Sequence, residues 1–330
     1  MSRTGPAGAT PADSASVDAG NLVRAAGGGD RRALARLLSL VDTASPALPE
    51  LMSALPAAPP HSSVVGVTGS PGVGKSTLVS ALVAECRRRD HTVAVLAVDP
   101  SSPFTGGSLL GDRMRMQDHA TDRGVFIRSM SSAGQLGGLA AATPPALRVL
   151  QAVGFDVVLL ETVGVGQSEV DVAFVSDTTV VVLAPGMGDV VQAMKAGVLE
   201  VGDVFVVNKA DRDGVRETVR DVRQMIRAGR PSDERPPPVL RTVATEAEGV
   251  VEVFDALERH RSEPAGTGRS ADRRKARAAM EIEAVAVSML RRQPTAEPDA
   301  TLLDLLAGRV AAGHDDAFTA AARLMRAAIS

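Results

Sequence analysis

The sequence predicts an α/β protein in which a mostly parallel β-sheet is sandwiched by helices. Short, nearly continuous apolar runs of strand length recur along residues 63–243, as is typical of parallel strands buried on both faces. Longer segments of helical periodicity lie between them. Alternation of this kind favours a parallel sheet covered by helices, with ligands bound at the carboxyl ends of the strands.

The chain divides into successive regions of different composition. Residues 1–20 are rich in Ala, Ser, Gly and Pro and predict a disordered tail. Residues 21–61 predict an N-terminal helical extension in which Asp30 is the N-cap of a second helix. Residues 62–261 hold the alternating strands and helices. After a polar hinge, residues 262–330 predict a helical arm with Ala- and Leu-rich faces.

Within these regions the pattern predicts individual elements. We expect helices from Asn21 onward and over 34–41, 49–55, 77–83, 143–153, 216–227 and 250–261. We expect strands over 64–67, 92–98, 125–128, 156–160, 178–183, 203–207 and 239–243.

Composition excludes several classes of function. A net charge of −3, with seven Phe and no Trp or Tyr, argues against a nucleic-acid-binding protein. Cys86 is the single cysteine, so an internal disulfide is excluded, and the five histidines lack metal-ligand spacing. The sequence shows neither a secretory core near its start nor an apolar run of membrane-spanning length. We therefore expect a cytoplasmic protein that binds neither nucleic acid nor membrane.

The most informative motif is G-x-x-x-x-G-K-[ST], which follows a predicted strand and precedes a predicted helix. This context is that of a phosphate-binding loop, in which backbone N–H groups and a helix N-terminus surround phosphates. Lys75 is expected to reach the β- and γ-phosphates, and the Ser76 hydroxyl is expected to bind Mg²⁺. The predicted phosphate-binding residues are Gly69, Ser70, Pro71, Gly72, Val73, Gly74, Lys75, Ser76 and Thr77.

A second motif, N-K-x-D, lies at the end of a later predicted strand and comprises Asn208, Lys209 and Asp211. The Asp211 carboxylate can accept two hydrogen bonds from the N1–H and 2-amino groups of guanine, a donor pair that adenine lacks. The motif therefore favours GTP over ATP. After the next strand, Val243, Ala244 and Thr245 are expected to offer a backbone N–H to the guanine oxygen.

Acidic residues at strand ends supply candidate Mg²⁺ ligands. Asp99 ends the second strand and Glu161 a later one, where oxygen ligands suit a hard cation beside a triphosphate. Helix capping is the alternative role for such acids. Gly164 is placed to sense the γ-phosphate through its N–H. Asp112 lies in a polar loop suited to switching between ordered and disordered states.

Three segments carry a resemblance to a known family. Residues 98–108 (Val-Asp-Pro-Ser-Ser-Pro-Phe-Thr-Gly-Gly-Ser), 110–116 (Leu-Gly-Asp-Arg-Met-Arg-Met) and 161–169 (Glu-Thr-Val-Gly-Val-Gly-Gln-Ser-Glu) resemble the MeaB/ArgK GTPases. The likeness covers about residues 29–260 and extends to the human methylmalonic aciduria type A protein. It implies a P-loop GTPase fold, with Asp99, Asp112 and Glu161 as Mg²⁺ and switch acids.

The resemblance also implies a function and partners. Members of this family are chaperones of adenosylcobalamin-dependent acyl-CoA mutases, and their GTP hydrolysis gates cofactor delivery and protects or reactivates the mutase. It implies a slow GTP hydrolase that a partner stimulates and that forms a homodimer through its C-terminal arm. Asp189, Gln192 and Lys195 match residues that couple the nucleotide state to the mutase, and Lys195 is also expected to act in catalysis. Val190 and Ala196 stand where relatives usually have Glu and Lys.

The sequence leaves two alternative functions open. The first is a P-loop kinase that transfers phosphate to a protein or a small molecule rather than to water. The second is a nickel-insertion GTPase, which needs clustered Cys and His, whereas this chain has one cysteine and dispersed histidines.

Overall fold

The computed structural model describes 18–43, 45–59, 61–99, 119, 121–131, 142–162, 168–186, 198–229 and 236–262, together with 302, 305, 306, 309 and 323. The chain forms two compact units, Met1–Ala271 and Asp272–Ser330. The sheet and the helices that cover it belong to the first unit. Among the helices described, none combines the length and the apolar character needed to cross a membrane.

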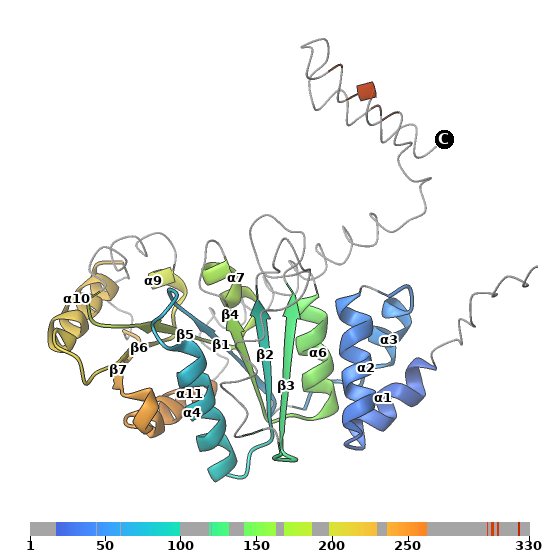
Figure 1. Ribbon diagram of the computed structural model, residues 1–330, viewed down its shortest axis with the longest axis horizontal. Helices are drawn as coiled ribbons and strands as arrows, with labels where there is room; N and C mark the ends of the chain where they lie inside the picture. The colour runs from blue at the N-terminus through green and yellow to red at the C-terminus, as the bar shows by residue number, and fades with distance from the viewer. Residues whose placement is uncertain are drawn as a thin grey trace, which may run out of the picture. The chain divides into compact units, whose positions relative to one another are not determined.

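The first unit is built on a parallel sheet of seven strands in the order β3-β2-β4-β1-β5-β6-β7. All seven carboxyl ends therefore meet at one edge (Figure 1). This confirms the predicted fold class. The strands are β1 (Ser63–Thr68), β2 (Val93–Asp99), β3 (Val125–Ser131), β4 (Val157–Thr162), β5 (Thr178–Leu183), β6 (Val204–Asn208) and β7 (Val239–Thr242).

Helices cover both faces of this sheet. Helices α4 (Lys75–Arg88) and α11 (Val250–Ser262) enclose one apolar cluster, which contains Cys86. The other face carries α6 (Thr143–Val153), α7 (Ser168–Val175), α9 (Val198–Val201) and α10 (Val215–Ala228). Burial raises the pKa of the Cys86 thiol to about 12, so this side chain serves packing rather than thiolate chemistry.

The first two of the predicted N-terminal helices pack against α6, the second also contacts the outer strand β3, and the third packs on the first. They are α1 (Ala19–Gly27), α2 (Arg31–Asp42) and α3 (Leu48–Ala54). Asp30 is the N-cap of α2, as predicted, and its carboxylate accepts hydrogen bonds from the next turn. The first helix begins at Ala19, two residues before its predicted start, because the Asp18 carboxylate caps it through the N–H of Asn21.

Most predicted elements agree with the structure to within a few residues. Helix α6 and strand β5 have the predicted bounds. Helices α7 and α9 have no counterpart in the prediction, because both are short and lack a clear polar face. The long predicted arm falls almost wholly outside the described residues.

Aspartates occupy equivalent positions at the amino edge of the sheet. Asp156, Asp177 and Asp203 each directly precede a strand, β4, β5 and β6 respectively. Each aspartate makes two hydrogen bonds to one partner residue in or next to the neighbouring strand. The aspartate N–H donates to the carbonyl oxygen of the partner, and the aspartate carboxylate accepts a hydrogen bond from the N–H of the partner. The partners are Thr92, Val64 and Thr179. Each aspartate therefore fixes the register of one strand against its neighbour.

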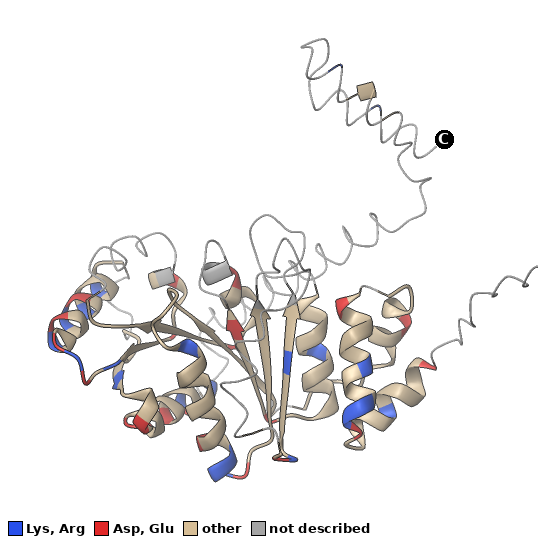
Figure 2. Cartoon of the chain, in the orientation of Figure 1, with Lys and Arg blue, Asp and Glu red and all other residues tan. Residues whose placement is uncertain are grey.

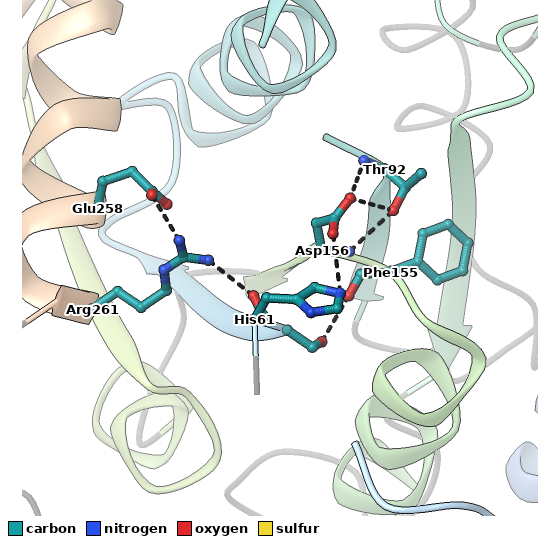
Figure 3. A network of polar contacts seen from close by, with 7 residues as sticks. His61, Thr92, Phe155, Asp156, Glu258 and Arg261 are labelled. Atoms are coloured by element: carbon teal, nitrogen blue, oxygen red, sulfur yellow. Dashed lines mark hydrogen bonds and ion pairs between the residues drawn. The ribbon is translucent and has the colours of Figure 1, made fainter. Parts of the chain in front are cut away.

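Asp156 is at the centre of the polar network in Figure 3. Its Oδ2 accepts hydrogen bonds from the N–H (2.7 Å) and hydroxyl (2.8 Å) of Thr92, and its Oδ1 lies 3.3 Å from Nε2 of His61. Arg261, in the last turn of α11, donates to the carbonyl oxygen of His61 and pairs with Glu258. The network thus connects β4, β2, the segment before β1 and the end of α11.

Burial acts to raise the pKa of Asp156, but the hydrogen bonds from Thr92 and the nearby His91 and His61 outweigh it. The folded-state pKa therefore lies below the ordinary value. A carboxyl whose pKa is lowered on folding stabilises the folded state above the unfolded-state pKa of about 3.9. That contribution is lost as the pH falls through the folded-state pKa.

We predict that Asp156→Asn lowers the free energy of unfolding at pH 7 by about 1–2 kcal/mol, since the charged acceptor of two hydrogen bonds is lost. The difference from the wild type should shrink as the pH falls below about 4. Guanidinium denaturation of the full chain at pH 7 and pH 3.5 measures both quantities. Asp221→Asn on an exposed part of α10 is the control and should change stability by less than about 0.5 kcal/mol. A difference that stays constant with pH would contradict the assignment.

Candidate functional site

The phosphate loop, residues 69–74, connects the carboxyl end of β1 to the first turn of α4. Gly69 and Gly74 have φ values of +140° and +96°, within the range that favours glycine. A Cβ on Gly69 would lie 2.2 Å from the carbonyl oxygen of Val182, and one on Gly74 would lie 2.4 Å from Nδ2 of Asn208. Both backbone conformation and space therefore require glycine at these positions.

Lys75 and Ser76 form the first turn of α4, and both are buried. Nζ of Lys75 donates to the carbonyl oxygens of Gly69 (2.7 Å) and Ser70 (3.1 Å), so its side chain lies back along the loop. The N–H groups at the start of α4 and the helix dipole add partial positive charge at the same point. The loop is therefore arranged to receive an anion such as a phosphate.

Glu161 forms a hydrogen bond with Ser76 in the first turn of α4. The Ser76 hydroxyl donates a 2.5 Å hydrogen bond to Oε1 of Glu161, which lies on β4 beside β1 and is buried. A hydroxyl and a carboxylate oxygen are ligand types that Mg²⁺ prefers. The donor atoms present at this point therefore fit a bound Mg²⁺.

Asn208 joins the phosphate loop to the loop that follows β7. Its Nδ2 donates to the carbonyl oxygen of Val73 at 2.9 Å, while its Oδ1 accepts from the Thr242 hydroxyl and the Ala244 N–H, both at 3.1 Å. The side chain is only 2% exposed. Its amide therefore ties the ends of β6 and β7 to the loop after β1.

Lys209 and Asp211 follow Asn208 at the same edge. Lys209 has the left-handed φ of +58°, and its Nζ donates to the carbonyl oxygen of Gly72 at 2.6 Å. The N–H of Ala210 donates to the carbonyl oxygen of Thr242 at 3.0 Å, which fastens the turn to β7. Asp211 is exposed one residue further on. The carboxylate therefore lies at the surface, next to a segment that is attached to the phosphate loop.

The segment after β7 makes backbone hydrogen bonds within the protein at residues that were predicted to contact guanine. The N–H of Val243 donates to the carbonyl oxygen of Glu248, and the N–H of Ala244 donates to Asn208. Ala244 also begins a short 3₁₀ turn, η2 (Ala244–Glu246). Two of the three N–H groups proposed for the guanine oxygen are thus used within the protein. Thr245, the third residue of the predicted set, has an exposed side chain.

Two threonine contacts at this edge were not predicted. The Thr242 hydroxyl fixes Oδ1 of Asn208, as described above. The Thr162 hydroxyl, next to Glu161, contacts the hydroxyl of Thr68 at 3.3 Å and so connects the ends of β4 and β1. Their position at strand ends, directly beside recognised motifs, was the available signal. Threonine is so common in strands that the residue type alone carried no information.

Several predicted site residues lie outside the described part of the chain. Asp99 ends β2, two strands from β1, but its side chain is not described. The predicted site residues that lie wholly outside the described part of the chain are Asp112, Gly164, Asp189, Gln192 and Lys195.

A phosphate loop between the central strand and α4, tied through Asn208 to an N-K-x-D turn, defines a P-loop GTPase. Comparisons with known proteins agree. Residues 34–299 match the model of the family described as methylmalonyl-CoA mutase-associated GTPase MeaB. The chain belongs to this family and is a GTP hydrolase.

Individual relatives support the same assignment. The chain is 45% identical over 260 residues to a protein of Pyrococcus horikoshii that is named as a GTPase, and the match covers 78% of this chain and 82% of that one. It is 37% identical over 214 residues to the mitochondrial methylmalonic aciduria type A homolog of Mus musculus, covering 64% and 52% of the two chains. The crystal structure of an LAO/AO transport system kinase has a TM-score of 0.66 and 27% identity, and the match covers 96% of this chain and 99% of that one.

We predict that Asn208→Ala lowers the free energy of unfolding by about 2–4 kcal/mol, because it leaves the buried Val73 carbonyl and Ala244 N–H without their partner. Guanine nucleotide affinity should fall as well, since the phosphate loop loses its tie to the guanine segment. Denaturant unfolding and titration with fluorescent GDP measure the two effects. The matched variant Asn208→Asp keeps the acceptor oxygen but loses the donor to Val73. If Asn208→Ala changes neither quantity, the side chain does not link the two segments.

Proposed function

We propose that this protein is a Mg²⁺-dependent GTPase that acts as a chaperone for an adenosylcobalamin-dependent acyl-CoA mutase. In this proposal GTP binding and hydrolysis gate delivery of the cofactor and protect or reactivate the mutase. The observation that carries the proposal is the match of residues 34–299 to a family described as mutase-associated GTPases. The geometry of the phosphate loop and the N-K-x-D turn supports it.

Each part of the site has a role in nucleotide binding. The N–H groups of residues 69–77 and the Lys75 ammonium bind the phosphates, and Lys75 moves from the loop carbonyls to the nucleotide. Asp211 accepts hydrogen bonds from the guanine ring, and the Thr245 N–H meets the guanine oxygen. Because Asn208 connects both segments, binding of the base and binding of the phosphates are mechanically linked.

The metal site is built from oxygen ligands. Ser76 and Glu161 would hold Mg²⁺ directly or through water, with Asp99 and Asp112 as further ligands. When bound, the ion supplies positive charge that offsets the charge developing on the β- and γ-phosphates. The protein contributes fixed positions for its oxygens and, through Gly164, an N–H near the γ-phosphate.

The partner-facing part of the proposal concerns segments outside the described residues. Asp189, Gln192 and Lys195 transmit the nucleotide state to the mutase, and Lys195 also acts in hydrolysis. Residues 262–330 form a helical arm that makes a cytoplasmic homodimer. The intrinsic hydrolysis rate is slow, and the mutase accelerates it.

The kinase alternative has one observation in its favour, since the structural relative with a TM-score of 0.66 is described as an LAO/AO transport system kinase. The nickel alternative has none, because within the described ranges no three His, Cys, Asp or Glu side chains gather to hold a metal ion. The acceptor of the phosphate distinguishes the two: a kinase transfers it to a protein or a small molecule, and a GTPase transfers it to water.

The deciding experiment is GTP hydrolysis by the full chain with and without methylmalonyl-CoA mutase, with ATP as the control nucleotide. We expect slow GTP turnover that the mutase accelerates, and no turnover of ATP. Lys75→Ala should weaken GTP binding by about 10- to 100-fold, because a charge-assisted contact to phosphate is lost. GTP turnover that is the same with and without the mutase would refute the chaperone proposal. Transfer of phosphate to an acceptor other than water would favour the kinase.

We further predict that Asp211→Asn lowers GTP affinity by about 100-fold while it raises affinity for xanthosine triphosphate. Xanthine carries a carbonyl where guanine carries the 2-amino group, so an amide donor matches it and a carboxylate does not. Competition with fluorescent GDP measures both affinities. Asp213→Asn, two residues further on and also exposed, is the control. Unchanged guanine selectivity in Asp211→Asn would refute the role of this carboxylate.

A further inference from the structure

Helix α10 has three distinct sides. Val219, Val222 and Ile226 form its buried side and pack on β5, β6 and β7. A second side carries the acidic residues Glu217 and Asp221. The third side carries a row of arginines at positions i, i+4, i+7 and i+11. This arginine row consists of Arg216, Arg220, Arg223 and Arg227.

The arginine row forms a narrow, exposed stripe. At 100° per residue its positions fall within an arc of about 60°, and at 1.5 Å per residue the row is about 16 Å long. All four side chains are exposed, and blue and red bands mark α10 in Figure 2. The whole chain has a net charge of −3, so this concentration of positive charge differs from the average of the protein.

Two of the four arginines make side-chain contacts within the described part of the protein. In the part of the chain that the structure describes, the side chains of Arg216 and Arg227 have no hydrogen-bond or ion-pair partner. Arg220 lies 3.6 Å from both Glu217 and Asp221, but its side chain is 70% exposed, so these pairs contribute little to stability. Arg223 makes one 3.5 Å contact with the carbonyl oxygen of Val239. The guanidinium groups therefore remain available to a partner.

The pattern of charge favours a protein partner. Guanidinium groups bind carboxylates in a planar, bidentate manner, so an acidic surface complements the row. The adjacent Glu217 and Asp221 would repel a uniform polyanion such as DNA or an anionic membrane. A protein surface, in contrast, can place carboxylates opposite the arginines and neutral or basic groups opposite the acids.

We propose that the arginine row of α10 is the docking surface for an acidic face of the client enzyme. The identity of the partner rests on the proposed function. The helix that carries the row begins close to the predicted base-binding residue Asp211. α10 starts at Val215, four residues after Asp211, so a partner bound along the row lies next in sequence to the predicted base-binding turn.

The test compares binding of methylmalonyl-CoA mutase to the wild type and to the double variant Arg216→Glu/Arg227→Glu by biolayer interferometry. These two residues are chosen because their replacement breaks no contact with a described residue. We expect affinity to fall by about tenfold or more, and the wild-type affinity to decrease between low and high salt much more than that of the variant. GTP turnover without mutase should not change. Arg216→Ala/Arg227→Ala should show an intermediate loss if the row acts through its charge.

Arg259→Glu is the matched control, because Arg259 is an exposed arginine on α11. Equal mutase binding by the wild type and the double variant overturns the docking surface and leaves the chaperone function intact. If the wild type neither binds the mutase nor responds to it, the proposed function and this inference fail together. Duplex DNA and phosphatidylserine vesicles are tested in parallel. Loss of binding to either of these in the double variant, with mutase binding intact, identifies the row as a site for polyanions and overturns the proposal.

Discussion

The buried amide of Asn208 is the contact on which the nucleotide site most depends. It is at the end of β6, yet its hydrogen bonds reach Val73 in the phosphate loop and Ala244 after β7. These segments are far apart in the sequence and are close only because β1, β5, β6 and β7 are neighbours in the sheet. An amide fits this position because it offers a donor and an acceptor at once. An aliphatic side chain would leave a buried carbonyl and a buried N–H without partners.

The two edges of the sheet have different tasks. At the amino edge, Asp156, Asp177 and Asp203 fix each strand against its neighbour through paired backbone contacts. At the carboxyl edge, β1, β4 and β6 end beside the residues predicted to bind the nucleotide. When the register of two paired strands is fixed at the amino edge, the residues at their carboxyl ends are fixed relative to each other as well, because a shift in register would move every residue of a strand by the same amount. The contact between Ser76 and Glu161 depends on the register of β1 against β4, since Ser76 follows β1 through the phosphate loop and Glu161 lies on β4. At the amino edge the Ser63 N–H supports this register by donating to the carbonyl oxygen of Asp156.

Helix α10 connects the core, the site and the surface. Its buried side holds β5, β6 and β7 together, and its first residue follows closely after the N-K-x-D turn. The remaining sides carry the arginine row and the acidic residues Glu217 and Asp221 separately. A helix that is fixed by its core contacts presents such charges at constant spacing, which a flexible loop does not.

The sequence by itself determined the fold class, the position of each described strand to within a few residues, and the two nucleotide motifs. These features depend on local patterns: apolar runs, glycines that permit unusual backbone angles, and short motifs with one chemical task. Tertiary structure alone decided which strands are neighbours, and therefore that Glu161 meets Ser76 and that Asn208 meets Ala244. Such pairings arise from sheet order, which no local pattern records, because residues from separate strands become neighbours only when the sheet assembles.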